Sequence, residues 1–394
     1  MKKAANVIFI IIFSLALAGI SLFTLRNGSE TTSYFENRTL AKPPEWSSDA
    51  FWSGSYLNEW EGFFSDHAAW RADAIKIGTL WRLRVLRLPE VNQVVPSGGV
   101  LLHMYPYGEW DQKAPPEDCD AVADELLALK NHVEQNGGQF FYVGVPCQAA
   151  FFAELYPDYL EHGEQYLPKL HQAFAQALEQ RGISYISIID RFSQDGNPAR
   201  YFTQTDHHYS LAGAFLTYQT ILERINEVCG QSLPFHPRDE WEIRTLPNPF
   251  LGSRNRKLYG LYPNTDSFSY AILRQPIPFT RLDNGREVES TLVTLPEDAE
   301  STVSYTAFMG GDIGETVIRT NRPELPRVLL FGDSYTNAVE TLLYASCDEF
   351  RSLDLRYYRE KTLWEYIEEY RPDYVIDLRD DSMFLGESPN STFR

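Results

Sequence analysis

Apolar runs and amphipathic segments alternate along the chain from about residue 118 to its end. Five short segments are predicted to be strands, at residues 139–145, 184–189, 327–331, 352–355 and 374–378, and the first of them reads as a buried strand. Segments with apolar residues at helical spacing lie between or beside them, at residues 120–135, 165–180, 211–228, 335–344 and 363–370. This alternation predicts an α/β fold in which a doubly wound parallel sheet has helices on both faces. Sites in such sheets form at the carboxyl ends of the strands.

Residues 230–325 interrupt the alternation. They contain many prolines, turn sequences such as Asp283-Asn284-Gly285, and short alternating runs such as Thr302–Phe308. We therefore expect a β-rich insertion within an α/β domain that covers residues 96–394. Most of this insertion is expected to lie outside the parallel sheet.

Residues 26–95 predict a stalk followed by a helical segment. Pro43 and Pro44 disfavour helix in the first part. Aromatic and aliphatic residues then recur at helical spacing, namely Leu57, Trp60, Phe63, Phe64, Trp70, Ile75, Ile77, Leu80 and Trp81. The simplest interpretation of such a stripe is that it packs into a core.

The first 25 residues predict a signal anchor. Lys2 and Lys3 precede an apolar run from Val7 to Leu25, which at ~1.5 Å per residue is long enough to cross a bilayer. The leading positive charges predict a single-pass protein of the cell membrane with its body outside the cytoplasm. The alternative is a cleaved signal peptide, because Ala16-Leu17-Ala18 resembles a small-x-small cleavage site. The run, however, stays apolar beyond that point.

Charge and cysteine spacing exclude several classes of protein. The net charge of −19 argues against a nucleic-acid partner, because phosphates would be repelled, and against a body that lies on an anionic membrane. Cys119, Cys147, Cys229 and Cys347 are far apart and form neither a CxxC pair nor a zinc spacing. We expect buried free thiols, no cofactor and no metal.

Two motifs carry candidate chemistry, TDHHYS at residues 205–210 and FGDSY at residues 331–335. Ser334 follows an apolar strand and precedes a helix, so it is a candidate nucleophile. His208 would take the proton of Ser334, and Asp206 would orient the imidazole ring. This assignment predicts a His208 ring nitrogen within roughly 2.6–3.2 Å of the Ser334 hydroxyl. The alternative is that Asp333, Ser334 and Ser210 only cap helices.

Six further residues are candidates for substrate binding. His207 either contacts substrate or makes a structural hydrogen bond. Tyr209 and Tyr335 are the tyrosines of the two motifs, and Asn337 lies one helical turn beyond Ser334. Arg356 either binds an acyl or sugar oxygen or pairs with Asp354. The backbone N–H of Gly311, in the pair Gly310-Gly311, either stabilises an oxyanion or belongs to a plain turn.

Several segments together carry a family resemblance. They are Glu36-Asn37-Arg38-x-Leu40, Phe64-x-Asp66-His67-x-x-x-Arg71, Thr205-Asp206-His207-His208, Gly310-Gly311-Asp312, Gly332-Asp333-Ser334-Tyr335-x-Asn337 and Asp354-Leu355-Arg356-Tyr357. The chain resembles the bacterial DHHW family and, through its late GDS motif, the SGNH-hydrolase-like O-acetyltransferases of alginate-type exopolysaccharides. Tyr209 departs from the tryptophan of the family motif. The resemblance implies an anchored or exported protein that acts on envelope polysaccharide. It also implies a membrane-bound O-acyltransferase as a partner that supplies the acyl group.

Three functions are consistent with these observations. The first is acyl transfer to or from a surface or secreted polysaccharide through Ser334, His208 and Asp206. The second is a non-catalytic envelope protein that binds glycan on the same fold. The third is a metal-dependent hydrolase that uses Asp206, His207 and His208, although no second cluster of acidic residues and histidines has suitable spacing.

Overall fold

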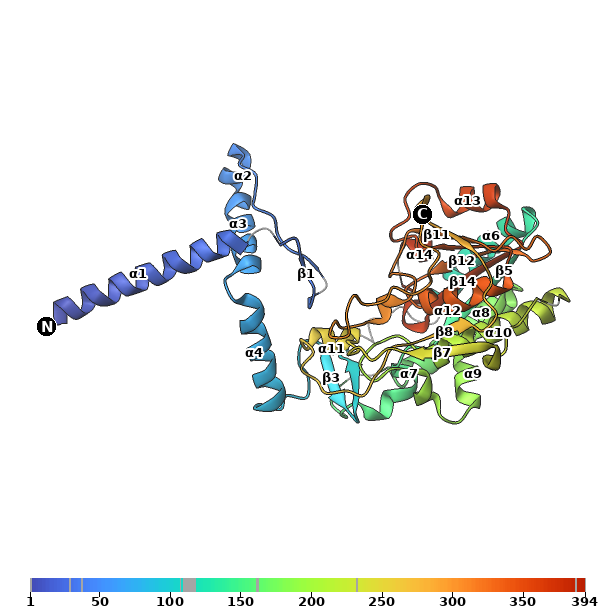
Figure 1. Ribbon diagram of the computed structural model, residues 1–394, viewed down its shortest axis with the longest axis horizontal. Coiled ribbons are helices and arrows are strands. Elements are labelled where there is room, and N and C mark those ends of the chain that lie inside the picture. Colours follow the sequence, from blue (N-terminus) through green and yellow to red (C-terminus); the bar gives the residue numbers. More distant parts are fainter. Residues whose placement is uncertain are drawn as a thin grey trace. The chain divides into compact units, whose positions relative to one another are not determined.

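A computed structural model describes residues 2–27, 30–36, 38–106, 108, 118–160, 163–231, 233–386 and 388–393 (Figure 1). The chain forms two compact units. Unit 1 comprises Met1–Asn92 together with Arg256–Tyr262, and unit 2 comprises Gln93–Asn255 together with Pro263–Arg394. The candidate catalytic motifs both lie in unit 2.

Unit 2 is built on an eight-stranded sheet in the order β10-β9-β11-β13-β12-β14-β5-β6. Five neighbouring strands are parallel, as predicted: β13 (Glu349–Leu353), β12 (Arg327–Gly332), β14 (Tyr374–Asp380), β5 (Gln139–Val145) and β6 (Ser184–Ser187). The carboxyl ends of these strands therefore lie along one edge of the sheet.

Two of the predicted strands have different limits. β6 ends at Ser187 because helix α9 (Ile188–Gln194) begins at the next residue. β13 ends at Leu353, since the carboxylate of Asp354 accepts a hydrogen bond from the backbone N–H of Arg356 and turns the chain (3.0 Å).

The sheet is mixed rather than wholly parallel, which corrects the predicted fold in part. Residues 230–325 contribute β9 (Thr280–Asp283), β10 (Arg286–Val288) and β11 (Glu315–Arg319), which extend the sheet beyond β13 through antiparallel pairs. β9 and β10 are joined by Asn284-Gly285, both with positive φ (47° and 73°), as a two-residue hairpin requires. Strands joined by so short a turn pair antiparallel, whereas parallel neighbours need a long crossover.

The rest of the insertion lies outside this sheet. β7 (Trp241–Thr245) and β8 (Ser269–Leu273) form a separate two-stranded ribbon. The alternating run Thr302–Phe308 does not form a strand and instead contains the 3₁₀ helix η5 (Tyr305–Ala307).

Helices cover both faces of the sheet because side chains alternate between the faces along each strand. On one face, Phe140, Tyr142, Leu329 and Phe331 pack with α6 (Cys119–Gln135), α8 (Tyr166–Gln180) and α13 (Leu363–Tyr370). On the other, Phe141, Val143, Leu330 and Ile376 pack with α9, α10 (Leu211–Cys229) and α12 (Thr336–Leu343). These two apolar layers hold the strands, and hence the carboxyl edge of the sheet, in place.

Shorter elements complete unit 2. They are β3 (Val94–Ser97), β4 (Val100–His103), α7 (Ala149–Phe152), α14 (Pro389–Thr392), and the 3₁₀ helices η2 (Ala153–Leu155), η3 (Pro198–Tyr201), η4 (Arg238–Glu240), η6 (Tyr344–Ser346) and η7 (Asp381–Met383); α11 (Ser253–Lys257) ends in unit 1.

All four cysteines are free, and Cys229 alone among them is not fully buried. Burial raises the pKa of the Cys119 thiol to about 11.

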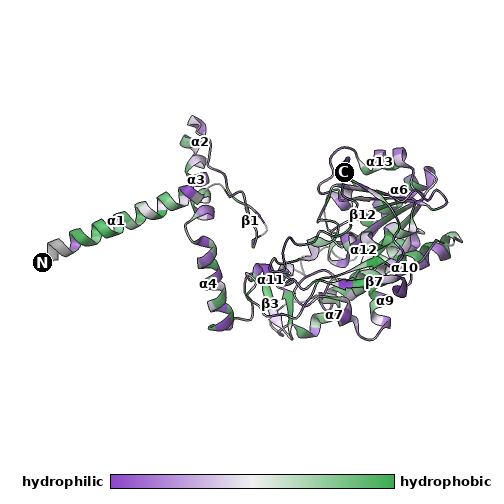
Figure 2. Cartoon of the chain, in the orientation of Figure 1, coloured by the Kyte–Doolittle hydropathy of each residue, from purple (hydrophilic) through white to green (hydrophobic). Residues whose placement is uncertain are grey.

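Unit 1 contains α1 (Lys2–Asn27), β1 (Thr32–Ser33), β2 (Arg38–Thr39), α2 (Ser48–Ser53), α3 (Ser55–His67) and α4 (Arg71–Arg84). Within α1, residues Asn6–Arg26 have a mean hydropathy of 2.6 and are long and apolar enough to cross a membrane. A membrane anchor and a signal sequence both satisfy this criterion. Figure 2 shows the apolar residues along α1.

The prediction that the stripe between residues 57 and 87 packs into a core is wrong. Phe63 is buried, but Leu57, Trp70, Ile77 and Trp81 are each more than half exposed. The stripe is divided into α3 and α4 by a break at residues 68–70, where Trp70 has a left-handed φ of 56°. Unit 1 has no second layer of helices or sheet among its described residues that could cover these side chains.

Two ion pairs hold the stalk of unit 1 against its helices. Arg38 binds both carboxylate oxygens of Asp66 (2.8 and 2.5 Å), and Arg71 binds both of Glu36 (2.5 and 2.9 Å). The hydrogen bonds from Arg38 lower the pKa of Asp66 to about 2. The two segments of the family resemblance that contain Glu36 and Asp66 therefore stabilise the fold of unit 1. Asn37, in the first of these segments, lies outside the described residues.

We expect Asp66→Asn to destabilise unit 1 by roughly 1–2 kcal/mol, because it removes the charged acceptor of a bidentate pair. Since the folded-state pKa is depressed, the stabilisation should be complete above the usual pKa of aspartate, ~3.9, and should disappear as the pH falls towards about 2. Denaturant unfolding in detergent, followed by tryptophan fluorescence at several pH values, measures both effects. Glu61→Gln on the exposed side of α3 is the matched control, and an equal loss in that variant would contradict the assignment.

Candidate active site

Ser334 occupies a tight turn between β12 and α12. A Cβ atom at Gly332 would lie 2.0 Å from the carbonyl oxygen of Leu378 on the adjacent strand, so this position requires glycine. The carboxylate of Asp333 accepts hydrogen bonds from the backbone N–H of Tyr335 (2.9 Å) and of Asp380 (3.1 Å). The turn is thereby fastened to β14, and Ser334 stays partly exposed at the carboxyl edge of the sheet.

The Asp-His motif is held by contacts with the insertion. Asp266 accepts hydrogen bonds from the backbone N–H (2.8 Å) and the hydroxyl (2.7 Å) of Thr205. Gly252 approaches the same residue so closely that a Cβ atom would lie 2.3 Å from the carbonyl oxygen of Thr205. The side chain of Gln148 donates to the carbonyl oxygen of Asp206 (2.9 Å). These contacts fix the backbone from which Asp206 and His208 project.

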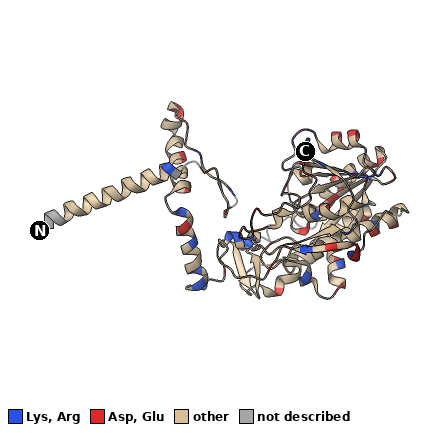
Figure 3. Cartoon of the chain, in the orientation of Figure 1, with Lys and Arg blue, Asp and Glu red and all other residues tan. Residues whose placement is uncertain are grey.

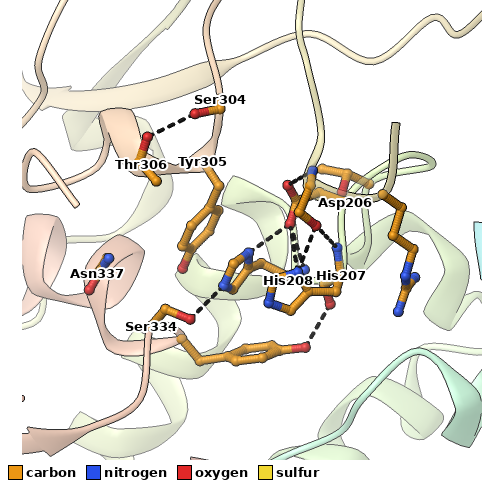
Figure 4. Close-up of polar contacts among 12 residues, drawn as sticks. Asp206, His207, His208, Ser304, Tyr305, Thr306, Ser334 and Asn337 are labelled. Atoms are coloured by element: carbon orange, nitrogen blue, oxygen red, sulfur yellow. Dashed lines mark hydrogen bonds and ion pairs between the residues drawn. The ribbon is translucent and has the colours of Figure 1, made fainter. Parts of the chain in front are cut away.

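The two motifs meet at His208, although they lie 126 residues apart (Figure 4). The Nε2 atom of His208 lies 2.7 Å from the hydroxyl of Ser334, within the expected range. The Nδ1 atom of His208 lies 2.7 Å from a carboxylate oxygen of Asp206. The order Ser334–His208–Asp206 is the geometry of an acyl-transfer triad.

Asp206 is a buried anion with its charge compensated by hydrogen bonds. Burial by itself would raise the pKa of Asp206, but the charge of His208 and the hydrogen bonds from it hold that pKa well below the usual range. The carboxylate also accepts from the backbone N–H of His208 (3.0 Å) and of Ser253 (2.6 Å). An ionised Asp206 assigns the proton of neutral His208 to Nδ1, which leaves Nε2 free to accept the proton of Ser334.

Two residues of this site, Tyr305 and Ser253, were not predicted from the sequence. The ring of Tyr305 stacks on that of His208, with centroids 3.7 Å apart and an interplanar angle of 5°. Ser253 provides the backbone N–H that binds Asp206. Both belong to segments far from the motifs in sequence, and nothing in their local pattern marks them. Their position depends on how the insertion folds back onto the sheet.

Tyr209 and Tyr335 connect the two motifs through their hydroxyl groups. Tyr209 is buried, and its hydroxyl donates to the backbone carbonyl of Tyr335. The hydroxyl of Tyr335 in turn donates to the backbone carbonyl of His207 (2.6 Å). A tyrosine in each motif thus binds the backbone of the other motif, which helps to hold Ser334 and His208 together.

His207 lies beside the triad but does not belong to it. Its ring is 3.7 Å from the ring of His208, and its Nδ1 atom bonds to the hydroxyl of Ser253 (2.7 Å). This is the structural hydrogen bond considered for His207. Its side chain is nevertheless 43% exposed, whereas that of His208 is 7% exposed.

The remaining candidates, Asn337, Arg356 and Gly311, are hydrogen-bonded to other groups of the protein. Asn337 is buried and donates to Asp312 (3.1 Å), which also accepts from Arg356 (3.2 Å). Arg356 pairs more closely with Asp354 (2.6 Å). The backbone N–H of Gly311 donates to the carbonyl of Phe308 (3.1 Å), so this N–H belongs to a turn and does not point at an oxyanion.

The donor atoms of Asp206, His207 and His208 lie within 4.8 Å of one another, which is compact enough for a metal ion. The donors are already engaged, however. Both ring nitrogens of His208 are hydrogen-bonded, and the two carboxylate oxygens of Asp206 accept from His208 and Ser253. A metal ion would have to replace these hydrogen bonds, so this donor set fits a triad better than a metal site.

Residues 105–252 match the family model of the SGNH hydrolase-like domain of acetyltransferase AlgX. The chain contains an SGNH hydrolase-like domain. The matched segment includes Asp206 and His208 and ends before Ser334, which the sheet brings to the same site. No curated protein matches the chain.

Solved structures support the same fold. PatB1 from Bacillus cereus has 22% sequence identity and a TM-score of 0.64, and the alignment covers 76% of this chain and 99% of that chain. PatB1 is also known with a sulfonyl adduct. A DHHW family protein from Eubacterium siraeum has 20% identity and a TM-score of 0.59, with 77% of this chain and 95% of that chain covered. At these identities the likeness establishes the fold of the SGNH-like domain.

We expect Tyr209→Phe to destabilise the protein by about 1–3 kcal/mol, because the buried carbonyl of Tyr335 loses its donor. The turn that carries Ser334 should also loosen, and the rate of any Ser334-dependent reaction should fall. Thermal unfolding and kinetics of the purified protein measure the two effects. Tyr159→Phe, at an exposed position, should change neither, and an unaltered melting temperature in Tyr209→Phe would contradict this role.

Proposed function

We propose that the protein is a Ser-His-Asp acyltransferase that transfers acyl groups to or from a cell-surface or secreted polysaccharide. The acyl group that we propose is acetyl. The observation that carries the proposal is the continuous hydrogen-bonded line from Ser334 through His208 to Asp206. The match to the SGNH-like domain of an acetyltransferase supports the same chemistry.

The first half-reaction forms an acyl-enzyme. The Ser334 oxygen attacks the acyl carbonyl while Nε2 of His208 takes the hydroxyl proton, and the anion of Asp206 stabilises the imidazolium. The candidate donor to the oxyanion is the backbone N–H of Ser334, which has no acceptor among the described residues and lies before a helix N-terminus. His208 then gives its proton to the leaving group as the bond from the carbonyl carbon to that group breaks.

The second half-reaction regenerates Ser334. A sugar hydroxyl attacks the acyl-enzyme, loses its proton to His208, and leaves as the ester while Ser334 recovers a proton. Water in place of the sugar gives an esterase. Of the candidate substrate contacts, the 43% exposed ring of His207 and the one-third exposed side chain of Arg356 are the proposed contacts with the acceptor. Tyr209 and Tyr335 are proposed to position the catalytic groups.

The proposed location is the outer side of a cell membrane, with α1 as an uncleaved anchor. Lys2 and Lys3 at the start of α1 favour an N-terminus inside. A protein at this position could receive acyl groups from a membrane-bound O-acyltransferase, which is the partner we propose.

Ser334→Ala should lower the rate of hydrolysis of a chromogenic acetate, and of acetyl transfer to an oligosaccharide, by roughly three orders of magnitude or more. An aryl sulfonyl fluoride should modify Ser334, with loss of fluoride and formation of an oxygen–sulfur bond that mass spectrometry detects. Ser334→Ala should abolish this modification.

Ser210→Ala is the matched control, because Ser210 caps α10 and its loss should cost only ~1 kcal/mol of stability and leave the rate unchanged. A folded Ser334→Ala protein with full activity would exclude Ser334 as the nucleophile. A wild-type protein that binds oligosaccharide without cleaving or transferring any ester would instead support the non-catalytic glycan-binding function.

The close donor atoms of Asp206, His207 and His208 favour a metal-dependent hydrolase as the second candidate. We expect the purified protein to contain well under one equivalent of transition metal, and we expect a chelator to leave its esterase activity unchanged, since the triad donors bind one another. Elemental analysis and assays with and without chelator test this. Stoichiometric metal with activity lost on chelation and restored by the ion would favour the metal-dependent reaction.

A further inference from the structure

Unit 1 exposes large apolar side chains on three successive helices. Trp52 on α2, Leu57 on α3, and Ile77 and Trp81 on α4 are 83%, 59%, 67% and 55% exposed. Trp70, the residue before α4, is 62% exposed, and Ile77 and Trp81 lie four residues apart on one face of α4. Exposed apolar side chains that lie on one face offer an interaction surface.

The segment that joins α3 to α4 contacts the C-terminal end of α1. The ring of Trp70 lies 5.7 Å from that of Phe23, and the backbone N–H of Ala69 donates to the hydroxyl of Thr24 (3.2 Å). Phe23 and Thr24 belong to the last turns of the helix that is long and apolar enough to cross a membrane. Tryptophan at the end of a spanning helix prefers the level of the lipid headgroups.

The charge of this segment is opposite to that of the whole chain. Residues 71–88 contain five basic side chains (Arg71, Lys76, Arg82, Arg84 and Arg87) and one acidic side chain (Asp73), and Arg71 alone among the five is paired with Glu36. The excess of positive charge belongs to α4 and the residues after it, because α2 and α3 contain acidic residues and no Lys or Arg, and the whole chain carries a net charge of −19. Figure 3 shows the basic residues along α4. Basic side chains placed between apolar ones suit an interface with anionic lipid, because the charged ends reach the headgroups while the stems stay in the apolar region.

We propose that α2, α3 and α4 lie in the outer membrane–water interface, with Trp52, Trp70, Ile77 and Trp81 inserted at the level of the headgroups and upper acyl chains. The inference rests on α1 as a membrane anchor and is independent of the acyl-transfer chemistry. A lipid interface is favoured over a protein partner because Ile77 and Trp81 of α4 lie among Lys76, Arg82 and Arg84, and because each exposed apolar side chain can partition into lipid separately.

The test uses the full chain reconstituted in vesicles of phosphatidylcholine and phosphatidylglycerol, in which the phosphatidylcholine carries bromine on the upper acyl chains. Bromine quenches tryptophan that it contacts. Three of the eight tryptophans belong to the proposed interface, so we expect loss of up to roughly three eighths of the emission relative to unbrominated vesicles. The triple variant Trp52→Phe/Trp70→Phe/Trp81→Phe should lose this quenching.

Trp364→Phe in α13 of unit 2 is the matched control and should leave the quenching unchanged. Equal emission in brominated and unbrominated vesicles would overturn the proposal. The same result, together with protection of Trp52 and Trp81 from oxidative footprinting in native membranes, would assign the surface to a protein partner instead. Mass spectrometry of the native protein tests the anchor. A mature chain that lacks residues 1–26 would overturn both the anchor and the interface. The proposed reaction at Ser334 would be unaffected by that result.

Discussion

The burial of one negative charge, that of Asp206, is the constraint on which the candidate site depends. An ionised carboxylate inside a protein is unstable unless hydrogen-bond donors surround it. Here the donors are the ring and backbone of His208 and the backbone N–H of Ser253. Because the carboxylate must keep these donors, the ring of His208 can take only one orientation, and in that orientation its second nitrogen meets Ser334.

The surrounding structure makes this arrangement rigid from three directions. The strands deliver Ser334 at the carboxyl edge of a sheet that is packed on both faces. The insertion delivers Ser253 and Tyr305, which bind the carboxylate and stack on the imidazole ring. Tyr209 and Tyr335 join the two motifs directly through their hydroxyl groups. The tyrosine that stands in place of the tryptophan of the DHHW motif connects the two motifs, since its phenol donates to the backbone of the turn that carries Ser334.

Much of this could be predicted from local pattern. The five parallel strands were recognisable because short segments rich in buried apolar residues alternate with segments of helical spacing. Ser334 was recognisable as a candidate because it stands where an apolar strand-like run meets a segment of helical spacing. The mixed character of the sheet was not recognisable, because β9, β10 and β11 are short and their pairing depends on partners elsewhere in the chain. Tyr305 was missed because its segment forms a 3₁₀ helix where alternation suggested a strand.

The sequence by itself determined the apolar anchor-like helix, the strand–helix order, and the three residue types that acyl transfer requires. These properties depend on the spacing of hydrophobic residues and on side-chain chemistry, both of which can be read from short stretches of the sequence. Only the tertiary structure decided that Ser334 and His208 meet, that Gly311 uses its N–H in a turn, and that the stripe of unit 1 faces outward instead of into a core. A helical stripe has the same spacing whether protein or lipid covers it, so burial depends on which layers the rest of the chain provides.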